Sequence, residues 1–218
     1  MNSQTTKHTV QGPAGRIDVL VDEPSAGDDA AAQVRGVAVI AHPHPLFGGT
    51  MDNKVVQTLA RAFVLCGWRA VRFNFRGVGG SEGTYDEGRG ELEDLLAVIG
   101  AQAQQGPLAL AGFSFGAFVT SHAVAAVAPQ RALNAVVLVG TAASRFQVSD
   151  VPQPLHERTL VLHGEQDDTV PLSAVMDWAR PQSLPVTVVP GGGHFFHGQL
   201  PLLRGLVVRH LLACNTFS

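Results

Sequence analysis

One serine lies between two glycines, at the point where a short apolar run gives way to a helical pattern. The run Leu108–Gly112 is typical of a buried strand, and the residues after it predict a helix over Phe115–Val127. Ser114 therefore occupies a Gly-x-Ser-x-Gly turn between strand and helix, where a hydroxyl is exposed beside the amide donors of the helix N-terminus. The alternative is a Gly-Ser turn that caps the helix. The flanking strand and helix favour a nucleophilic serine.

A serine hydroxyl needs a base to act as a nucleophile, and the chain contains nine histidines. His194 follows three glycines and the apolar run Val186–Val189, so a pliable loop can bring its ring over the end of a strand. His197, three residues later, is the alternative. We predict that His194 is the base and that His163, which follows another apolar run, is a structural histidine.

A carboxylate is needed to orient the base. Three acidic residues, Glu165, Asp167 and Asp168, follow the predicted strand Thr159–Leu162. Asp167 lies nearest the apex of this loop and is the preferred candidate. Asp168 is the second, because it can also act as a turn or cap residue before the next helix. Glu165 has a longer side chain but lies close to the strand end.

Each candidate follows a predicted strand, and the strands alternate with longer helical segments. This alternation predicts right-handed crossovers and a mostly parallel twisted sheet covered on both faces, which is a three-layer α/β/α sandwich. Ligand sites in such sheets lie beyond the carboxyl ends of the strands. The first two strands flank the turn Gly12–Gly15 and predict an N-terminal antiparallel hairpin. The predicted strands are Thr6–Gln11, Arg16–Val21, Gly36–Ala41, Ala70–Asn74, Leu108–Gly112, Ala135–Val139, Thr159–Leu162 and Val186–Val189. The predicted helices are Asp52–Cys66, Gly90–Gln105, Phe115–Val127, Leu172–Ala179 and Leu200–Ala213.

Three longer loops connect these elements: Asp22–Gln33, Phe75–Glu87 and Thr141–Glu157. None of them reads as a linker between domains, so we predict a single domain over residues 1–218. The last loop has 17 residues and two prolines, which is too short for a helical cap domain. Arg76, in the second loop, is expected to tie loops together.

The composition excludes several classes of protein. Of the 218 residues, 45% are hydrophobic and 15% are charged, which excludes bulk disorder. The formal net charge of −3 predicts no binding to nucleic acid. No apolar run is long enough to span a bilayer, and Met1–Thr9 lacks a signal pattern, so we expect neither membrane insertion nor export.

Cysteine and histidine usage indicates neither a disulfide framework nor a metal site. Cys66 and Cys214 are far apart and neither has a zinc-type spacing, which favours a cytoplasmic protein. His42 and His44 lack an evident third ligand. We therefore expect no metal and no cofactor.

Three further segments carry a resemblance to a known family: 42–54, 72–83 and 193–198. With the Ser114 turn, they resemble the α/β-hydrolase superfamily across nearly the whole chain, and in particular a group of small, lidless bacterial serine hydrolases. That group is related to dienelactone hydrolases and to the hydrolase domains of acyl-peptidases. The resemblance implies Ser114 as nucleophile, Asp167 as acid and His194 as base, in the chain order of that superfamily. Dienelactone hydrolases proper use a cysteine nucleophile, so the serine here argues against dienelactone as the substrate.

The resemblance also implies an oxyanion hole made of two backbone amides. The first belongs to Phe115, the residue after the nucleophile. The second comes from the segment Ala41–Leu46, in which the two prolines have no amide hydrogen. Many relatives have His-Gly-x at this place, which indicates the amide of His44 here, with Leu46 as the alternative.

These expectations combine into a function. We predict a serine hydrolase of the carboxylesterase type (EC 3.1.1) that cleaves short-chain carboxylic esters or thioesters through an acyl-enzyme. We expect its partner to be a small-molecule acyl substrate. We also expect the protein to be a monomer or a small homo-oligomer. The alternatives are a non-catalytic binding protein of the same fold, and acyltransferase or peptidase activity of the same residues.

Overall fold

The structure is a computed structural model that describes residues 5–24 and 34–214. Residues 25–33, which make up most of the predicted loop over 22–33, lie outside the described residues. The same is true of residues 1–4, part of the polar N-terminal segment, and of residues 215–218.

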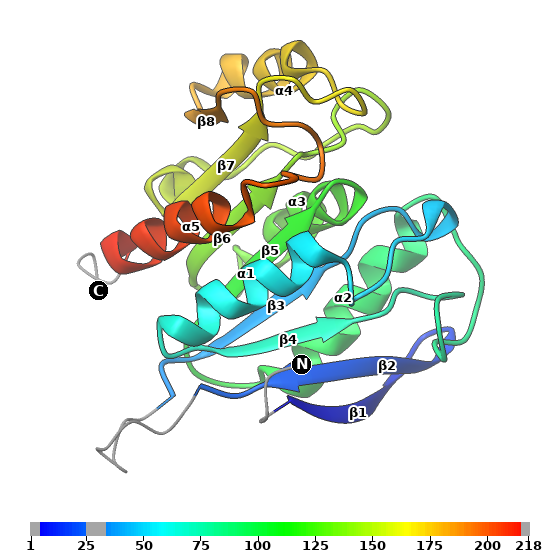
Figure 1. The fold of residues 1–218 in the computed structure, drawn as a ribbon. Coiled ribbons are helices and arrows are strands. Elements are labelled where there is room, and N and C mark those ends of the chain that lie inside the picture. Colours follow the sequence, from blue (N-terminus) through cyan, green and yellow to red (C-terminus); the bar gives the residue numbers. More distant parts are fainter. Residues whose placement is uncertain (1–4, 25–33, 215–218) are drawn as a thin grey trace.

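Eight strands form one sheet in the order β1-β2-β4-β3-β5-β6-β7-β8 (Figure 1). The strands β1 and β2 form the predicted antiparallel hairpin, and β2 pairs antiparallel with β4. All the other pairs are parallel, as the alternation of strands and helices predicts. The strands are β1 Thr5–Gly12, β2 Gly15–Asp22, β3 Val37–Ala41, β4 Arg69–Phe73, β5 Leu108–Phe113, β6 Leu133–Val139, β7 Thr159–Gly164 and β8 Val186–Val189.

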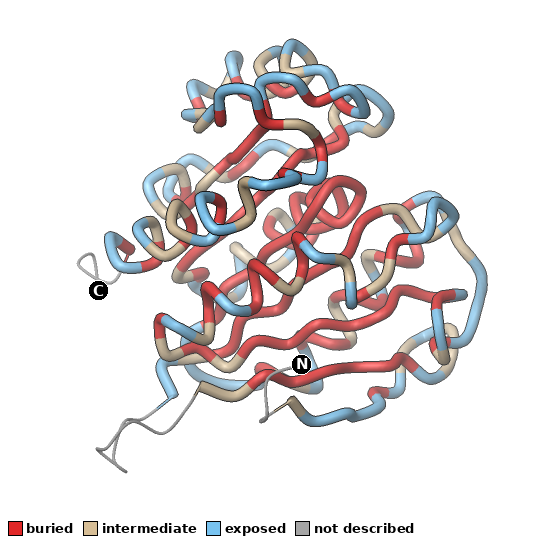
Figure 2. Tube along the Cα trace, in the orientation of Figure 1, coloured by how far each residue is buried: buried red, intermediate tan, exposed pale blue. Residues whose placement is uncertain are grey.

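Helices cover both faces of the sheet and complete three layers. Helices α1 (Lys54–Leu65) and α5 (Leu200–Cys214) pack side by side on one face (Figure 1). The sheet has a hydrophobic core on each face. Helices α2 (Arg89–Gln102), α3 (Phe115–Val127) and α4 (Leu172–Ala179) bury their apolar sides in the core on the opposite face. Figure 2 shows that the central strands and α3 are buried along almost their whole length. Removing this apolar surface from water is the main driving force that holds the layers together.

Several element boundaries differ from the predicted ones. Helix α1 begins at Lys54, two residues after the predicted start, because the Asn53 side chain accepts a hydrogen bond from the Val55 amide and caps the helix there. Helix α2 ends at Gln102 and not at 105, since Ala103 leaves the helical conformation, with a φ of −136° and a ψ of 50°, and Gly106 follows with a φ of 79°. The predicted loop over 141–157 contains most of the short 3-10 helix Gln153–Arg158. Two further 3-10 helices, Pro45–Phe47 and Arg180–Gln182, were not predicted.

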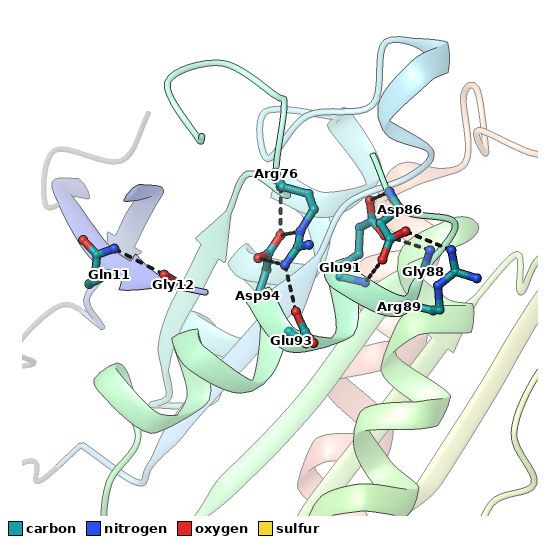
Figure 3. A network of polar contacts seen from close by, with 10 residues as sticks. Gln11, Gly12, Arg76, Asp86, Gly88, Arg89, Glu91, Glu93 and Asp94 are labelled. Carbon is teal, nitrogen blue, oxygen red and sulfur yellow. Dashed lines mark hydrogen bonds and ion pairs between the residues drawn. The ribbon is translucent and has the colours of Figure 1, made fainter. Parts of the chain in front are cut away.

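The glycine-rich loop between β4 and α2 is fastened to α2 by ionic contacts (Figure 3). The Arg76 guanidinium donates to both carboxylate oxygens of Asp94, over 3.0 and 2.8 Å, and the Arg76 amide donates to the same carboxylate. The Glu91 carboxylate accepts from the amides of Asp86 and Gly88 at the start of the helix. Arg76 is therefore a structural residue, as expected, but it ties this loop to a helix and not loops to one another.

Neither cysteine forms a disulfide: Cys66 and Cys214 are both free and buried. Within the described ranges, no helix has the length and apolar character that crossing a bilayer requires.

Candidate active site

Ser114 lies on a sharp turn between β5 and α3. Its φ of 57° and ψ of −115° are strained for a residue with a side chain. The turn is possible because the flanking glycines allow close backbone contacts. A Cβ atom at Gly112 would lie 2.3 Å from the Gly116 carbonyl oxygen, and one at Gly116 would lie 2.4 Å from the Ala41 carbonyl oxygen. The Ser114 amide donates to Val139 on the neighbouring strand, over 2.8 Å.

His194 reaches this serine from the loop after β8. Its Nε2 atom lies 3.0 Å from Ser114 Oγ, although the two residues are 80 positions apart in the sequence. The Phe113 ring, 4.9 Å away between centroids, packs against the imidazole. Phe196, two residues after His194, is fully buried in the core below α1 and α5. This buried side chain anchors the loop that carries the histidine.

Asp167 orients the imidazole from the loop after β7. Its Oδ2 atom lies 2.7 Å from His194 Nδ1, and its Oδ1 atom accepts from the amides of Thr169 and Val170. Burial by itself would raise the pKa of this carboxyl, but these hydrogen bonds outweigh it and hold the pKa below its usual value. Because the ionised carboxylate only accepts, Nδ1 of His194 carries a hydrogen and Nε2 is free to take the serine proton.

The alternatives to these three residues point elsewhere. The Asp168 carboxylate accepts from the Thr169 hydroxyl, and the Glu165 carboxylate accepts from the Gly191 amide. His197 is exposed and packs its ring against Phe195. The structure thus brings Ser114, His194 and Asp167 together and leaves these other candidates apart.

His163 packs under the Asp167 carboxylate. Its Nε2–H group donates to the Val170 carbonyl over 2.9 Å and lies 3.5 Å from Asp167 Oδ2. Its Nδ1 atom is buried and has no partner among the described residues. Burial lowers the pKa of this ring, so it is neutral beside the carboxylate. His163 is therefore a structural histidine, as predicted, but its ring is only half hydrogen-bonded.

His42 has a supporting role that its sequence pattern did not predict. It is fully buried at the end of β3, where its Nδ1–H group donates to the Pro43 carbonyl over 2.6 Å and Nε2 accepts from the Phe75 amide over 3.0 Å. Burial lowers the pKa of this ring to about 4, although the bond to Pro43 opposes the shift. A neutral His42 therefore joins the segment before His44 to the loop after β4. Its place directly after an apolar strand was the only sequence signal for this role.

Two backbone amides beside Ser114 lack acceptors. Within the part of the chain that the structure describes, neither the Phe115 amide nor the His44 amide donates to a protein group. The Leu46 amide, by contrast, donates to Nδ1 of the His44 side chain over 3.2 Å. The close approach of Gly116 to the end of β3 brings the two segments with free amides toward each other.

A cavity of about 330 Å³ opens over Ser114 and His194. Although Ser114 is only 8% exposed, it lines this cavity, so a small molecule can reach its hydroxyl. Phe47 and Phe195 contribute apolar surface to the lining, and Arg145 contributes its positive charge. Among the described residues, no group of three or more histidine, cysteine or acidic side chains is arranged to hold a metal ion.

The chain is similar to several known proteins over most of its length. A family model described as the alpha/beta hydrolase fold matches residues 44–157. An uncharacterized protein of Rickettsia prowazekii is 31% identical over 200 residues, which is 85% of this chain and 79% of that protein. A crystal structure from Xanthomonas campestris, described as an α/β serine hydrolase without lid, is 39% identical, with a TM-score of 0.83, and covers 97% of this chain and 95% of its own. A structure from Coxiella burnetii, described as an alpha-beta serine hydrolase homologue, is 39% identical, with a TM-score of 0.78, and covers 94% and 97% of the two chains.

Proposed function

The chain belongs to the α/β-hydrolase family, in its group of small members without a lid, and on this premise we propose that it is a serine hydrolase of the carboxylesterase type. The observation that carries the proposal is the line of hydrogen bonds from Ser114 through His194 to Asp167, with lengths of 3.0 and 2.7 Å. This line ends at an open cavity, where an acyl compound can meet the serine hydroxyl.

In the proposed reaction, His194 Nε2 takes the proton of Ser114 while the serine oxygen attacks the acyl carbonyl. Asp167 holds the imidazole and stabilises the cation that forms. The imidazolium then gives its proton to the leaving alcohol or thiol, and an acyl-enzyme remains. His194 next removes a proton from water, and the hydroxide attacks the acyl-enzyme. The bond between the acyl carbon and the Ser114 oxygen then breaks, the imidazolium returns its proton to that oxygen, and the products are a carboxylic acid and the free serine.

The amides of Phe115 and His44 are the proposed donors to the tetrahedral oxyanion. Both lack a protein acceptor among the described residues, whereas the Leu46 amide already donates to His44 Nδ1. This contrast favours His44 over Leu46 as the second donor. Each such donor lowers the barrier by roughly 3–4 kcal/mol, because it meets charge that develops only in the transition state.

The proposed substrates are short-chain carboxylic esters or thioesters. The cavity is small, and the 141–157 segment supplies a short 3-10 helix and no apolar cap over it. A thioester uses the same steps as an ester, since only the leaving group differs. Both classes are small molecules, and neither requires a cofactor for this chemistry.

Ser114→Ala tests the proposal. With 4-nitrophenyl butyrate as substrate, we expect kcat to fall by about 10⁴-fold or more, because the nucleophile is removed. Labelling by a fluorophosphonate probe should also be lost. Ser144→Ala is the matched control, since Ser144 is an exposed serine that does not line the cavity. Undiminished turnover in Ser114→Ala, or a wild-type protein that neither hydrolyses the ester nor reacts with the probe, would refute the proposal.

A further inference from the structure

Arg145 is the only arginine, lysine or acidic residue among the described residues that line the cavity. It follows β6 in the segment 141–157 and is exposed. No acidic residue lines the same cavity. An anion in this cavity would therefore meet a positive charge and no carboxylate in the lining; Arg145 also lines a neighbouring cavity, and the lining of that one includes Glu87.

The Arg145 guanidinium has no ion-pair or hydrogen-bond partner among the described residues, whereas three other arginines form buried or partly buried ion pairs. Arg76 binds both oxygens of Asp94 (Figure 3), and Arg72 binds Asp22 over 2.9 Å. Arg69 binds Glu23 over 2.6 Å. The fork of donors on Arg145 is thus available to a ligand, and its planar geometry matches a carboxylate.

Arg145 lines the same cavity as His44 and the segment 43–49. Burial lowers the pKa of His44, and the positive charge of Arg145 acts in the same direction. In the proposed reaction the leaving alcohol takes its proton from His194 and lies on that side. The His44 amide is the proposed donor to the oxyanion of the acyl carbonyl, so we place the acyl half along residues 43–49, in the cavity that Arg145 also lines.

We propose that Arg145 selects substrates whose acyl half ends in a carboxylate, such as monoesters of short dicarboxylic acids. This inference rests on the proposed function and names its substrate class. One guanidinium balances one carboxylate charge, whereas a phosphate group with nearly two charges would leave one unpaired. Pockets of this kind are mostly apolar and obtain their specificity from a few polar groups of this type.

The test compares an acidic ester with its neutral counterpart of equal chain length. The substrates are 4-nitrophenyl hydrogen glutarate and 4-nitrophenyl methyl glutarate, which differ only in whether the far carboxyl is free or methylated. The measured quantity is the ratio of kcat/KM for the acidic ester to kcat/KM for the methyl ester. We expect a ratio of about ten in the wild type at low ionic strength, since a charge-assisted hydrogen bond is partly screened at this exposed position.

In Arg145→Gln the ratio should fall to about one, and in Arg145→Lys it should be intermediate, because lysine keeps the charge but loses the fork of donors. Raising the ionic strength should lower the ratio in the wild type and not in Arg145→Gln. Arg204→Gln removes the same charge from α5, outside the cavity lining, and should keep the wild-type ratio. The thermal midpoint of each variant verifies that it is folded.

Three outcomes overturn the inference. A ratio that is equal in the wild type and Arg145→Gln shows that the guanidinium does not recognise the acyl half. A loss that is equally large in Arg204→Gln assigns the effect to net charge. If the wild type hydrolyses neither ester, the proposed function fails and this inference fails with it, which distinguishes that case from the first two.

Discussion

At the scale of single residues, buried hydrogen bonds hold Asp167 and the segment that leads to His44. Two backbone amides fix the Asp167 carboxylate from the side opposite His194. His42 fixes the segment that leads to His44, and it does so only as a neutral ring, because one nitrogen donates and the other accepts. The site therefore depends on buried imidazoles that must stay uncharged as well as on the one that must change its charge.

The buried ring of His42 predicts a loss of stability in mild acid. In the folded protein its pKa is about 4, whereas the ring in the unfolded chain has the ordinary value of about 6.5. Between these values the unfolded state binds more protons, so the free energy of unfolding decreases as the pH falls. From pH 7.5 to pH 5 this one group should lower the free energy of unfolding by about 2 kcal/mol.

Urea unfolding of the wild type and His42→Gln at the two pH values measures this effect. The variant should be less stable at pH 7.5, because the Pro43 and Phe75 groups lose their partner, but it should lose less stability on acidification. His44, His163 and His210 also have lowered pKa values, so part of the pH dependence will remain. The exposed His197, changed to glutamine, is the control. Identical pH dependence in the wild type and His42→Gln would contradict the prediction.

At the scale of elements, the site depends on how closely α3 approaches the end of β3. The contact at Gly116 has no room for a side chain, since a Cβ atom would lie 2.4 Å from Ala41 O and 2.5 Å from His42 O. Both of these oxygens are backbone atoms, so they cannot move aside as the end of a flexible side chain would. The distance between these two elements also sets the separation of the Phe115 and His44 amides.

Gly116→Ala should therefore reduce activity as well as stability. We expect kcat for the butyrate ester to fall by about 10²-fold or more, which is the effect of losing one oxyanion donor. Helix α3 must shift from β3, so the thermal midpoint should fall too. The measurements are kcat and the thermal midpoint of the purified variant.

Gly100→Ala is the matched control for this substitution. Gly100 also lies in a helix, but a Cβ atom there meets nothing within 4 Å. Alanine should stabilise that helix by roughly 0.5–1 kcal/mol and leave kcat unchanged. A Gly116→Ala protein that keeps full activity would show that the approach of α3 to β3 does not set the oxyanion geometry.

At the scale of the whole molecule, the cavity is open because none of the described elements folds over the carboxyl ends of the strands. The segment 141–157, which follows β6, contributes Arg145 and a short 3-10 helix and then returns to β7. Phe47 is 73% exposed and Leu46 is 66% exposed near the mouth, so apolar surface borders the cavity without closing it. A long acyl chain would find no apolar cover there.

We therefore expect the protein to prefer short acyl chains. The value of kcat/KM for 4-nitrophenyl decanoate should be at least about tenfold below that for the butyrate. The reason is that a pocket discriminates by about this factor or more against a substrate whose extra methylene does not fit it. Both esters must be assayed below the concentration at which the longer one forms micelles. Faster hydrolysis of the decanoate would argue for an apolar cover that forms when substrate binds.

Much of the fold and of the candidate site follows from short stretches of the sequence. The alternation of apolar runs with helical patterns indicated the parallel sheet, its hairpin and the two helical layers. The glycines around Ser114 indicated the strained turn, since only residues without a side chain permit such close backbone contacts. These signals are local, because periodicity and turn chemistry act over a few residues. Element ends were less well determined, as the side-chain cap at Asn53 shows.

Only the tertiary structure decided which side chains meet. The direction of Asp167, and not of Asp168 or Glu165, toward His194 depends on a loop 27 residues away in the chain. The same holds for three other features of the site, which depend on how the folded chain arranges its loops. These are the Leu46 amide that donates to His44, the buried His42 that joins two loops, and the unpaired guanidinium of Arg145. The physical reason is that the direction of a loop side chain is set by hydrogen bonds and packing to distant strand ends. Those contacts exist only after the sheet has brought the strand ends to one edge.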